Sequence, residues 1–123
     1  MAKYVDGFII PIQKNKVSKY KKIAAKAGKL WMKYGAIEYF ETVGVDIAEM
    51  PGMVPFKRLC KLKKNETVVL AWIVYKSKAH RVQVLKKVMN DPWITGYDPK
   101  DMPIDMKRMS VGGFNAFVAL SKK

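Results

Sequence analysis

The fold is decided by the stretch Thr67-Val68-Val69-Leu70-Ala71-Trp72-Ile73-Val74-Tyr75. Most of its residues are β-branched or aromatic, which is the composition typical of strands. Because successive side chains of a strand point to opposite faces, this strand is apolar on both faces of its sheet. An antiparallel sheet with one wet face alternates apolar and polar residues instead. The stretch therefore predicts a strand that is covered on both sides.

The elements around this strand follow from local patterns. Apolar residues three and four apart predict an amphipathic helix over 15–34, and Ser77 is a helix-capping residue that predicts a second helix ending at Asn90-Asp91-Pro92. Strands are expected over 3–12, 36–46, 56–63, 67–75 and 110–120, with a hairpin between 56–63 and 67–75. Irregular structure is expected over 47–55 and 93–109, where proline and glycine recur.

This order of elements predicts a single α+β domain over residues 1–123. It matches the ferredoxin-like βαββαβ plan with an antiparallel sheet and one possible extra strand. Two helices cover only one face of such a sheet, yet strand 3–12 also carries apolar residues on both sides. A second copy of the sheet is the economical cover, so we expect a homodimer with a closed or semi-closed interior, a dimeric α/β barrel.

The charge is the unusual global property of the chain. Lysine and arginine outnumber aspartate and glutamate by 24 to 10, a formal net charge of +14. Part of this charge forms one stripe along the polar side of the first helix: Lys19, Lys22, Lys26, Lys29 and Lys33. The stripe is either a solvated helix surface, which is the simpler interpretation, or a track for nucleic-acid phosphates.

Other functional classes lack their usual signals. Cys60 is the only cysteine and His80 the only histidine, so the sequence predicts neither a disulfide, a metal site nor a hydrolase triad. Nucleotide-binding and zinc-protease motifs are missing, and we expect no cofactor. No run of about 20 apolar residues and no secretion signal occurs, so we expect a cytoplasmic protein without a membrane partner.

Asp6 is the most suggestive candidate for a site. It lies between Val5 and Gly7 on a central strand, where an unpaired carboxylate would be costly. We expect Lys107 or Arg108 to pair with it, since the first and last strands are neighbours in this fold. This pair either anchors the last segment or belongs to a ligand cleft. The cleft hypothesis places four residues around a small polar or aromatic ligand, in a cleft either between the sheet and the helices or between subunits: Asp6, Glu41, Trp72 and Arg108.

Several stretches resemble the bacterial family of uncharacterised YbaA-like proteins over nearly the whole chain. They are Tyr4 to Phe8, Ala24 to Lys26 with Tyr34 to Ala36, Val69 to Ser77, Val88 to Pro92, Met102 to Asp105 with Lys107 to Met109, and Gly112 to Phe114. The resemblance implies the dimeric α/β barrel fold and a dimer. It implies no activity, because the members have unknown function.

Three hypotheses for the function follow. The first is a dimeric module that binds a small ligand or has a structural role. The second is an enzyme, a cofactor-independent oxygenase or isomerase that uses the barrel pocket, as the resemblance to this superfamily implies. The third is nucleic-acid binding through the lysine stripe, which is not favoured.

Overall fold

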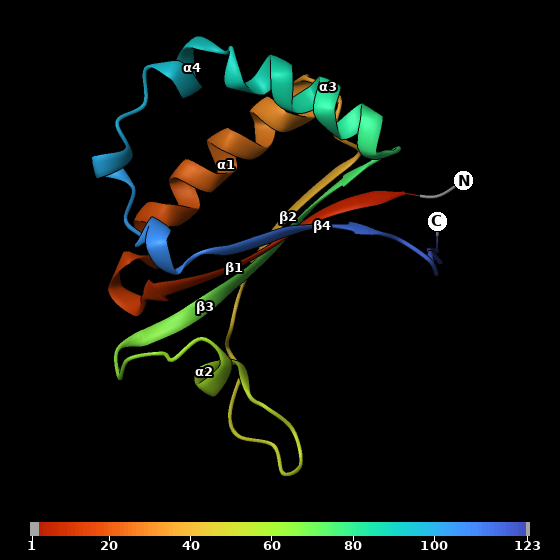
Figure 1. Cartoon of the computed structure of the whole chain (residues 1–123). Helices are drawn as coiled ribbons and strands as arrows, with labels where there is room; N and C mark the ends of the chain where they lie inside the picture. The colour runs from red at the N-terminus through yellow and green to blue at the C-terminus, as the bar shows by residue number, and fades with distance from the viewer. Residues whose placement is uncertain (1–2, 123) are drawn as a thin grey trace.

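The computed structural model describes residues 3–122, which form a four-stranded antiparallel sheet in the order β2-β3-β1-β4. The strands are β1 (Tyr4–Gln13), β2 (Glu38–Val43), β3 (Glu66–Tyr75) and β4 (Ser110–Asn115). β3 is the strand that the apolar stretch predicts, and it lies between β1 and β2 (Figure 1). The expected α+β, ferredoxin-like architecture is confirmed.

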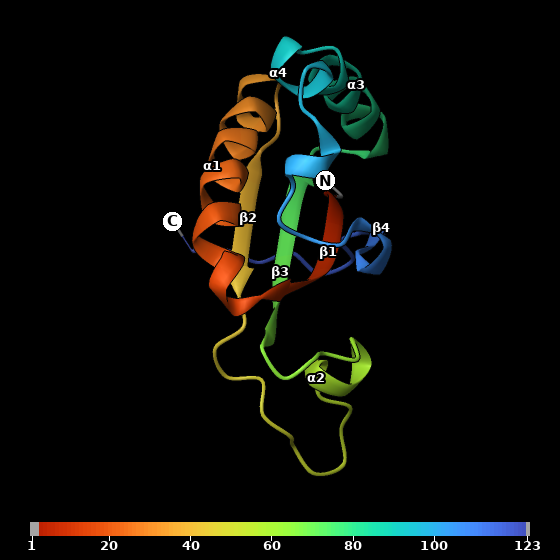
Figure 2. The same ribbon diagram turned by 90° about the vertical axis from the view of Figure 1, so that its left-hand side faces the viewer.

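The two long helices lie on the same face of the sheet (Figures 1 and 2). They are α1 (Val17–Lys33), which follows a short 3-10 turn η1 (Lys14–Lys16), and α3 (Lys78–Met89). Ser77 caps α3 as predicted, because its Oγ accepts a hydrogen bond of 3.1 Å from the His80 backbone N–H. Short helical turns interrupt the remaining connections: α2 (Phe56–Leu59), α4 (Pro92–Thr95), η2 (Pro99–Asp101) and η3 (Met106–Arg108).

The strand register fixes which side chains face the helices. Ala71 and Ile73 of β3 belong to the buried core beneath α1 and α3, together with Ile10 and Ile12 of β1. We call this side of the sheet the helix face. Tyr75, the last residue of β3, also lies on the helix face and is fully buried. Burying side chains of this size stabilises the fold by roughly 1.5 to 3 kcal/mol each.

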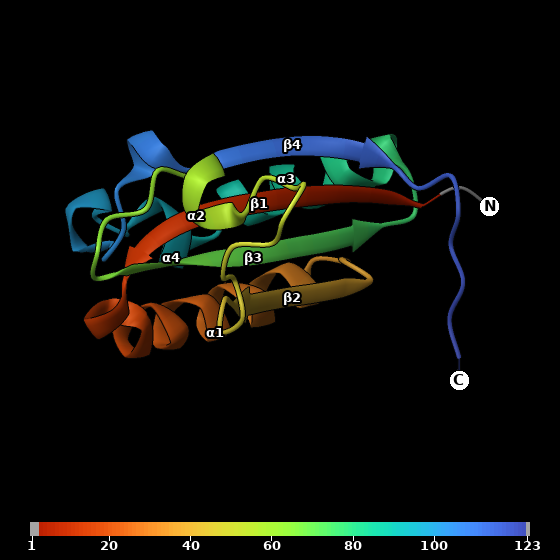
Figure 3. The ribbon, with the colours of Figure 1, turned by 90° about the horizontal axis from the view of Figure 1, so that it is seen from below.

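The opposite side of the sheet, which we call the open face, is also apolar. The register places these side chains on it: Val5, Ile9, Phe40, Leu70, Trp72 and Phe114. Phe40 and Trp72 stack there with ring centroids 5.0 Å apart. No helix of eight residues or more among residues 3–122 covers this face, and Figure 3 shows only the connection that contains α2 in front of the strands.

Two predicted strands need correction. The strand over 56–63 is wrong: its first four residues form the short helix α2, since the Leu59 and Cys60 N–H groups bond to carbonyls four residues back. The hairpin expected there is therefore wrong as well, because β3 pairs with β2 and β1. The last strand ends at Asn115 and not at Leu120. The pairing of β4 with β1 extends to Asn115, opposite Tyr4, and the Ala116 N–H donates one further hydrogen bond of 2.9 Å to the Lys3 carbonyl.

No helix within residues 3–122 is long and apolar enough to span a bilayer.

Candidate functional site

A cavity of about 350 Å³ lies between the helix face of the sheet, the helices α1 and α3, and the 102–109 segment. Most of its lining is apolar. The sheet contributes Phe8, Ile10, Ala71 and Ile73; α1 contributes Ile23, Ala27 and Trp31; α3 contributes Leu85 and Met89; the 102–109 segment contributes Met102, Ile104, Met106 and Met109. Methionine side chains adapt to irregular contours, so this wall can adjust to the shape of an occupant.

One polar group of the cavity is the ion pair between Asp6 and Arg81. The Arg81 Nε lies 2.9 Å from each carboxylate oxygen of Asp6. Asp6 is 2% exposed, whereas about a third of the Arg81 side chain is accessible. The hydrogen bond to Asp6 raises the pKa of Arg81 further above its ordinary range. Within residues 3–122 the terminal nitrogens of Arg81 donate to no protein acceptor, so they are free to bind a ligand.

Trp31, which lines the cavity, is held in place by the fully buried Tyr75. The Trp31 Nε1 donates a hydrogen bond of 3.1 Å to the Tyr75 hydroxyl. Burial, and then the negative charge of Asp6, raise the pKa of Tyr75 above its ordinary range. Tyr75 therefore stays protonated near neutral pH, and its hydroxyl remains a hydrogen-bonding group and not a base.

A second polar cluster consists of Tyr20, Tyr39 and Glu41. The Tyr20 hydroxyl donates to Glu41 Oε1 and the Tyr39 hydroxyl to Glu41 Oε2, each over 2.6 Å. Burial, together with the Glu41 charge, raises the pKa of both tyrosines well above the usual range. Both tyrosines therefore act as hydrogen-bond donors that hold the carboxylate in place.

Gly28 determines where the Tyr39 ring lies. A Cβ atom at this position of α1 would come within 2.8 Å of the Tyr39 Cδ1 atom. The missing side chain lets the ring lie against the helix backbone, with its hydroxyl next to Glu41. α1 thus supplies both a donor to the cluster, from Tyr20, and the space that the other donor needs.

The tyrosine cluster separates the cavity from a groove on the outside of the molecule. This groove, of about 390 Å³, runs between α1 and the edge strand β2. It shares four residues with the cavity lining: Tyr20, Ala24, Tyr39 and Glu41. Since the same side chains line both spaces, a change in the cluster would alter access to the cavity from this side.

The two polar groups lie at different positions across the sheet. Asp6 on β1 and Tyr39 on β2 flank Ile73 of β3, and Glu41 lies two residues further along β2. With strands about 4.8 Å apart and about 3.4 Å per residue, the Asp6 and Glu41 Cα atoms are separated by roughly 12 Å. The cavity can therefore hold an elongated apolar molecule that carries a polar group near each end.

The structure brings together only two of the four residues in the cleft hypothesis. Asp6 and Glu41 line the cavity. Trp72 lies on the open face, because it alternates with Ala71 and Ile73 along β3. Arg108 lines a separate polar pocket, where its Nη1 donates to Glu66 Oε2 over 2.6 Å. This bond lowers the pKa of Glu66 and raises that of Arg108.

The expected partner of Asp6 is therefore wrong. Arg81 on α3 pairs with Asp6, and Lys107 and Arg108 do not. The antiparallel register explains why: Tyr4 pairs with Tyr75, and α3 begins three residues after Tyr75, so its first turn lies above the start of β1. Pairing strands 3–12 and 67–75 from the sequence would have placed Arg81 within reach of Asp6.

The roles of Tyr20 and Tyr39 were also missed, because both residues fit the apolar pattern of their elements. The available signal was Glu41 itself. It shares a strand face with Tyr39, two residues away, and a carboxylate on a buried face needs donors.

The lysine stripe lies on the outside of α1, and all five of its side chains are exposed. Lys26 lies 5.4 Å from the centre of the Trp93 ring and Lys33 lies 5.2 Å from that of Tyr34, so both contact aromatic faces. The exposure is compatible with both interpretations of the stripe. In the described part of the chain, no group of three or more His, Cys, Asp or Glu residues is arranged to hold a metal ion.

Known proteins resemble this chain over almost its full length. It is 36% identical over 116 residues to the uncharacterised protein YbaA of Escherichia coli K12 and to that of Shigella flexneri, an alignment that covers 94% of this chain and 97% of those proteins. Two solved structures share the fold. An uncharacterised NIPSNAP domain protein from Burkholderia xenovorans has a TM-score of 0.55 at 16% identity, over 98% of this chain and 99% of the other.

The second structure is described as a dimeric ferredoxin-like protein from an uncultured marine organism. It has a TM-score of 0.57 at 10% identity and covers 99% of this chain and all of its own. The model of a family of proteins of unknown function, DUF1428, matches residues 3–106. On the strength of this match and of the identity to YbaA, the chain belongs to the DUF1428 family.

Proposed function

We propose that this protein binds a small, mostly apolar molecule in the cavity between the sheet and the helices. The observation that carries the proposal is the cavity of about 350 Å³ with an apolar lining and a polar group near each end. Ligand pockets in proteins have volumes of about 300 to 1,000 Å³ and combine an apolar lining with a few placed polar groups. Side chains from the sheet, both long helices and the 102–109 segment meet here.

The polar groups indicate the chemistry of the ligand. The free terminal nitrogens of Arg81 suit a carboxylate, another oxyanion or a carbonyl group. The Glu41 carboxylate accepts one bond on each oxygen and retains capacity to accept from a hydroxyl or an amine. The ligand class is therefore an apolar, elongated acid or carbonyl compound with a hydrogen-bond donor at its other end.

The polar groups of the cavity are arranged to bind and orient a ligand. Tyr20 and Tyr39 each donate a hydrogen bond to Glu41, and Asp6 is held by Arg81. Donors and acceptors fixed in this way set the orientation of a bound molecule.

We further propose that the working form is a homodimer in which two open faces pack together. The open face carries large apolar side chains, including Phe40, Leu70 and Phe114, that remain in part exposed in one chain. Such a contiguous apolar surface is typical of an interface. A solved structure of similar fold is described as a dimeric ferredoxin-like protein, which supports a dimer here.

Two fluorescent probes with the same ring skeleton test the ligand proposal. 8-Anilinonaphthalene-1-sulfonate is an anion, and N-phenyl-1-naphthylamine is its neutral counterpart. We expect both to bind. The double variant Asp6→Asn, Arg81→Gln leaves no unpaired buried charge. It should lower the affinity for the anionic probe by about tenfold, or ~1.4 kcal/mol, and lower the affinity for the neutral probe much less. Equal losses for both probes would contradict the role of Arg81.

The location of the probe is tested by filling the cavity. Ala27→Trp should abolish the binding of both probes, because Ala27 points from α1 into the cavity. Val82→Ser is the matched control, since Val82 is an exposed residue of the other long helix. Probe binding that survives Ala27→Trp unchanged would overturn the proposal.

A further inference from the structure

Two exposed apolar segments flank the open face, one at each end of the sheet. The first is the loop 44–65 between β2 and β3, whose exposed apolar side chains are Val45, Met50, Met53, Val54 and Leu59. The second is the C-terminal segment 116–122, in which Phe117 is 96% and Leu120 92% exposed. Neither segment buries these side chains within its own chain. Exposed apolar groups in such number indicate a surface that another molecule covers.

The two segments of one chain cannot cover each other. The loop leaves the sheet where Gln13 pairs with Glu66, and the C-terminal segment leaves it where Tyr4 pairs with both Tyr75 and Asn115. Ten strand residues separate these ends, which corresponds to roughly 30 Å. Figure 1 shows the loop below the sheet and the C-terminus at the right-hand ends of the strands, and Figure 3 shows the C-terminal segment beyond these strand ends.

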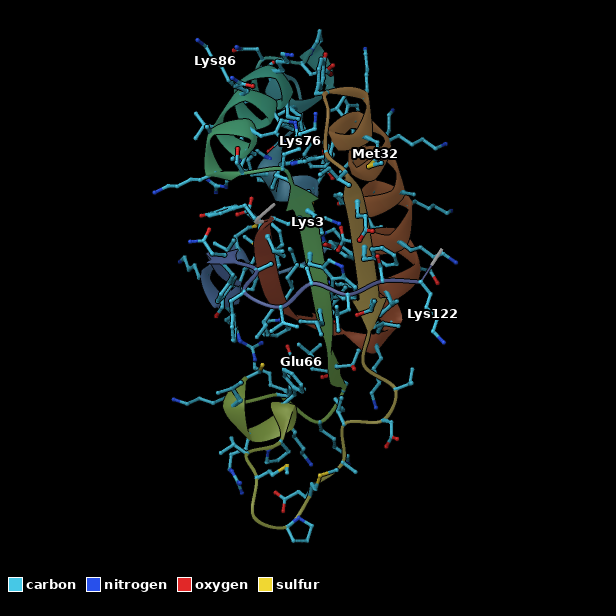
Figure 4. The ribbon with its side chains drawn as sticks, turned by 90° about the vertical axis from the view of Figure 1, so that its right-hand side faces the viewer. Lys3, Met32, Glu66, Lys76, Lys86 and Lys122 are labelled. Atoms are coloured by element: carbon cyan, nitrogen blue, oxygen red, sulfur yellow. The ribbon has the colours of Figure 1, made fainter. Side chains whose placement is uncertain are left out.

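Both segments project on the side of the open face. The loop with α2 hangs below the sheet, on the side away from α1 and α3 (Figure 1), and in Figure 4 the C-terminal segment, with Lys122, passes in front of the strands on this side. The loop is held in shape by its own contacts, since the Arg58 Nη2 donates to the Met53 carbonyl over 3.1 Å and Arg58 approaches Glu49 to 3.6 Å. It is thus a formed projection with apolar side chains on its surface.

We infer that the loop 44–65 of one subunit packs on the C-terminal segment 116–122 of the other, so that each dimer has two such clasps. This inference rests on the proposed dimer. In two sheets that pack face to face, a twofold axis across the strands brings the loop end of one subunit to the C-terminal end of its partner. An axis along the strands would instead place loop beside loop and leave both Phe117 side chains near each other, far from the loops.

Disulfide trapping distinguishes these arrangements, because Cys60 is the only cysteine of the chain and Cys60→Ser provides a background without thiols. In that background, chains with Met53→Cys are mixed with chains with Phe117→Cys, the subunits are exchanged, and the mixture is oxidised. A denaturing, non-reducing gel should show a two-chain band that contains one chain of each kind.

Matched controls make every outcome informative. Val82→Cys, on the outer surface of α3, should give no two-chain band with Phe117→Cys. A two-chain band from Phe117→Cys alone would show an axis along the strands and overturn the clasp. Light scattering on the unoxidised variants separates the two proposals: a dimer without the mixed band rejects the clasp and leaves the dimer standing, whereas a single-chain mass rejects both.

Discussion

Gly28 sets the close contact between α1 and Tyr39, and this contact can be tested by adding a single methyl group. Alanine forms helices better than glycine by about 1 kcal/mol. In Gly28→Ala, however, the new Cβ would lie 2.8 Å from the Tyr39 ring. We expect the variant to be destabilised by roughly 1 to 3 kcal/mol through overpacking, measured by chemical denaturation.

The control for this variant is Lys29→Ala, at the next position of the same helix, where the side chain is exposed. It should change the free energy of unfolding by no more than about 0.5 kcal/mol. A Gly28→Ala protein as stable as the wild type would mean that the Tyr39 ring is not held against the helix.

The buried tyrosines predict a loss of stability at alkaline pH. Burial raises the pKa of Tyr20, Tyr39 and Tyr75 in the folded state. A raised pKa contributes stability that is fully present below the unfolded value of about 10 and is lost as pH rises above it. The free energy of unfolding should therefore fall above about pH 10, by up to ~1.4 kcal/mol per pH unit for each tyrosine.

Unfolding curves measured at a series of pH values, with the ultraviolet absorbance of tyrosinate as a second signal, check this prediction. Tyr20→Phe removes one titrating group and should make the decline shallower. Tyrosinate that forms fully while the protein remains folded would contradict the buried hydrogen bonds to Glu41.

The lysine stripe lies on α1, outside the cavity. We therefore expect charge changes in the stripe to leave ligand binding in the cavity unaffected. Lys22 and Lys29 point to solvent, so Lys22→Glu with Lys29→Glu should leave the binding of the neutral probe unchanged. If the stripe binds nucleic acid, the logarithm of the affinity falls with the logarithm of salt concentration, with a slope of about 0.9 per phosphate contacted. Binding to a duplex that is insensitive to both salt and this charge reversal would exclude the stripe as a nucleic-acid site.

The elements also show what could be predicted from the sequence. The strong periodic patterns gave α1, α3, β1 and β3 within a few residues, because each has a clear apolar face and α3 has its cap at Ser77. The prediction for 56–63 was wrong because the four-residue helix there depends on local hydrogen bonds after Pro55. A segment this short shows no periodic pattern. The predicted end of β4 was wrong because the end depends on how far β4 pairs with β1.

Of the residues in the candidate site, only the two carboxylates could be predicted from the sequence. Asp6 and Glu41 stand out as charges on apolar strands, and both line the cavity. Their partners depend on strand pairing and helix placement, which is why Arg81 and Tyr20 could not be assigned from local pattern alone. The face on which Trp72 lies could not be predicted, because a strand that is apolar on both sides gives no internal sign of which side the helices cover.

At the scale of the whole molecule, the sheet carries two apolar surfaces with different uses. The helix face lines a cavity that remains within one chain. The open face, with Leu70 and Phe114, is covered by no long helix among residues 3–122. Leaving apolar surface of this kind in water forfeits about 25 cal/mol per Å² that its burial would contribute. We propose that a second copy of the sheet covers this apolar surface.

Sedimentation equilibrium at micromolar concentration tests this central claim most directly. We expect the mass of two chains for the wild type. Leu70→Glu places a charge in the middle of the open face, and it should give the mass of one chain that still folds and still binds the neutral probe in its cavity. A wild-type protein that sediments as a single chain at these concentrations would contradict the account.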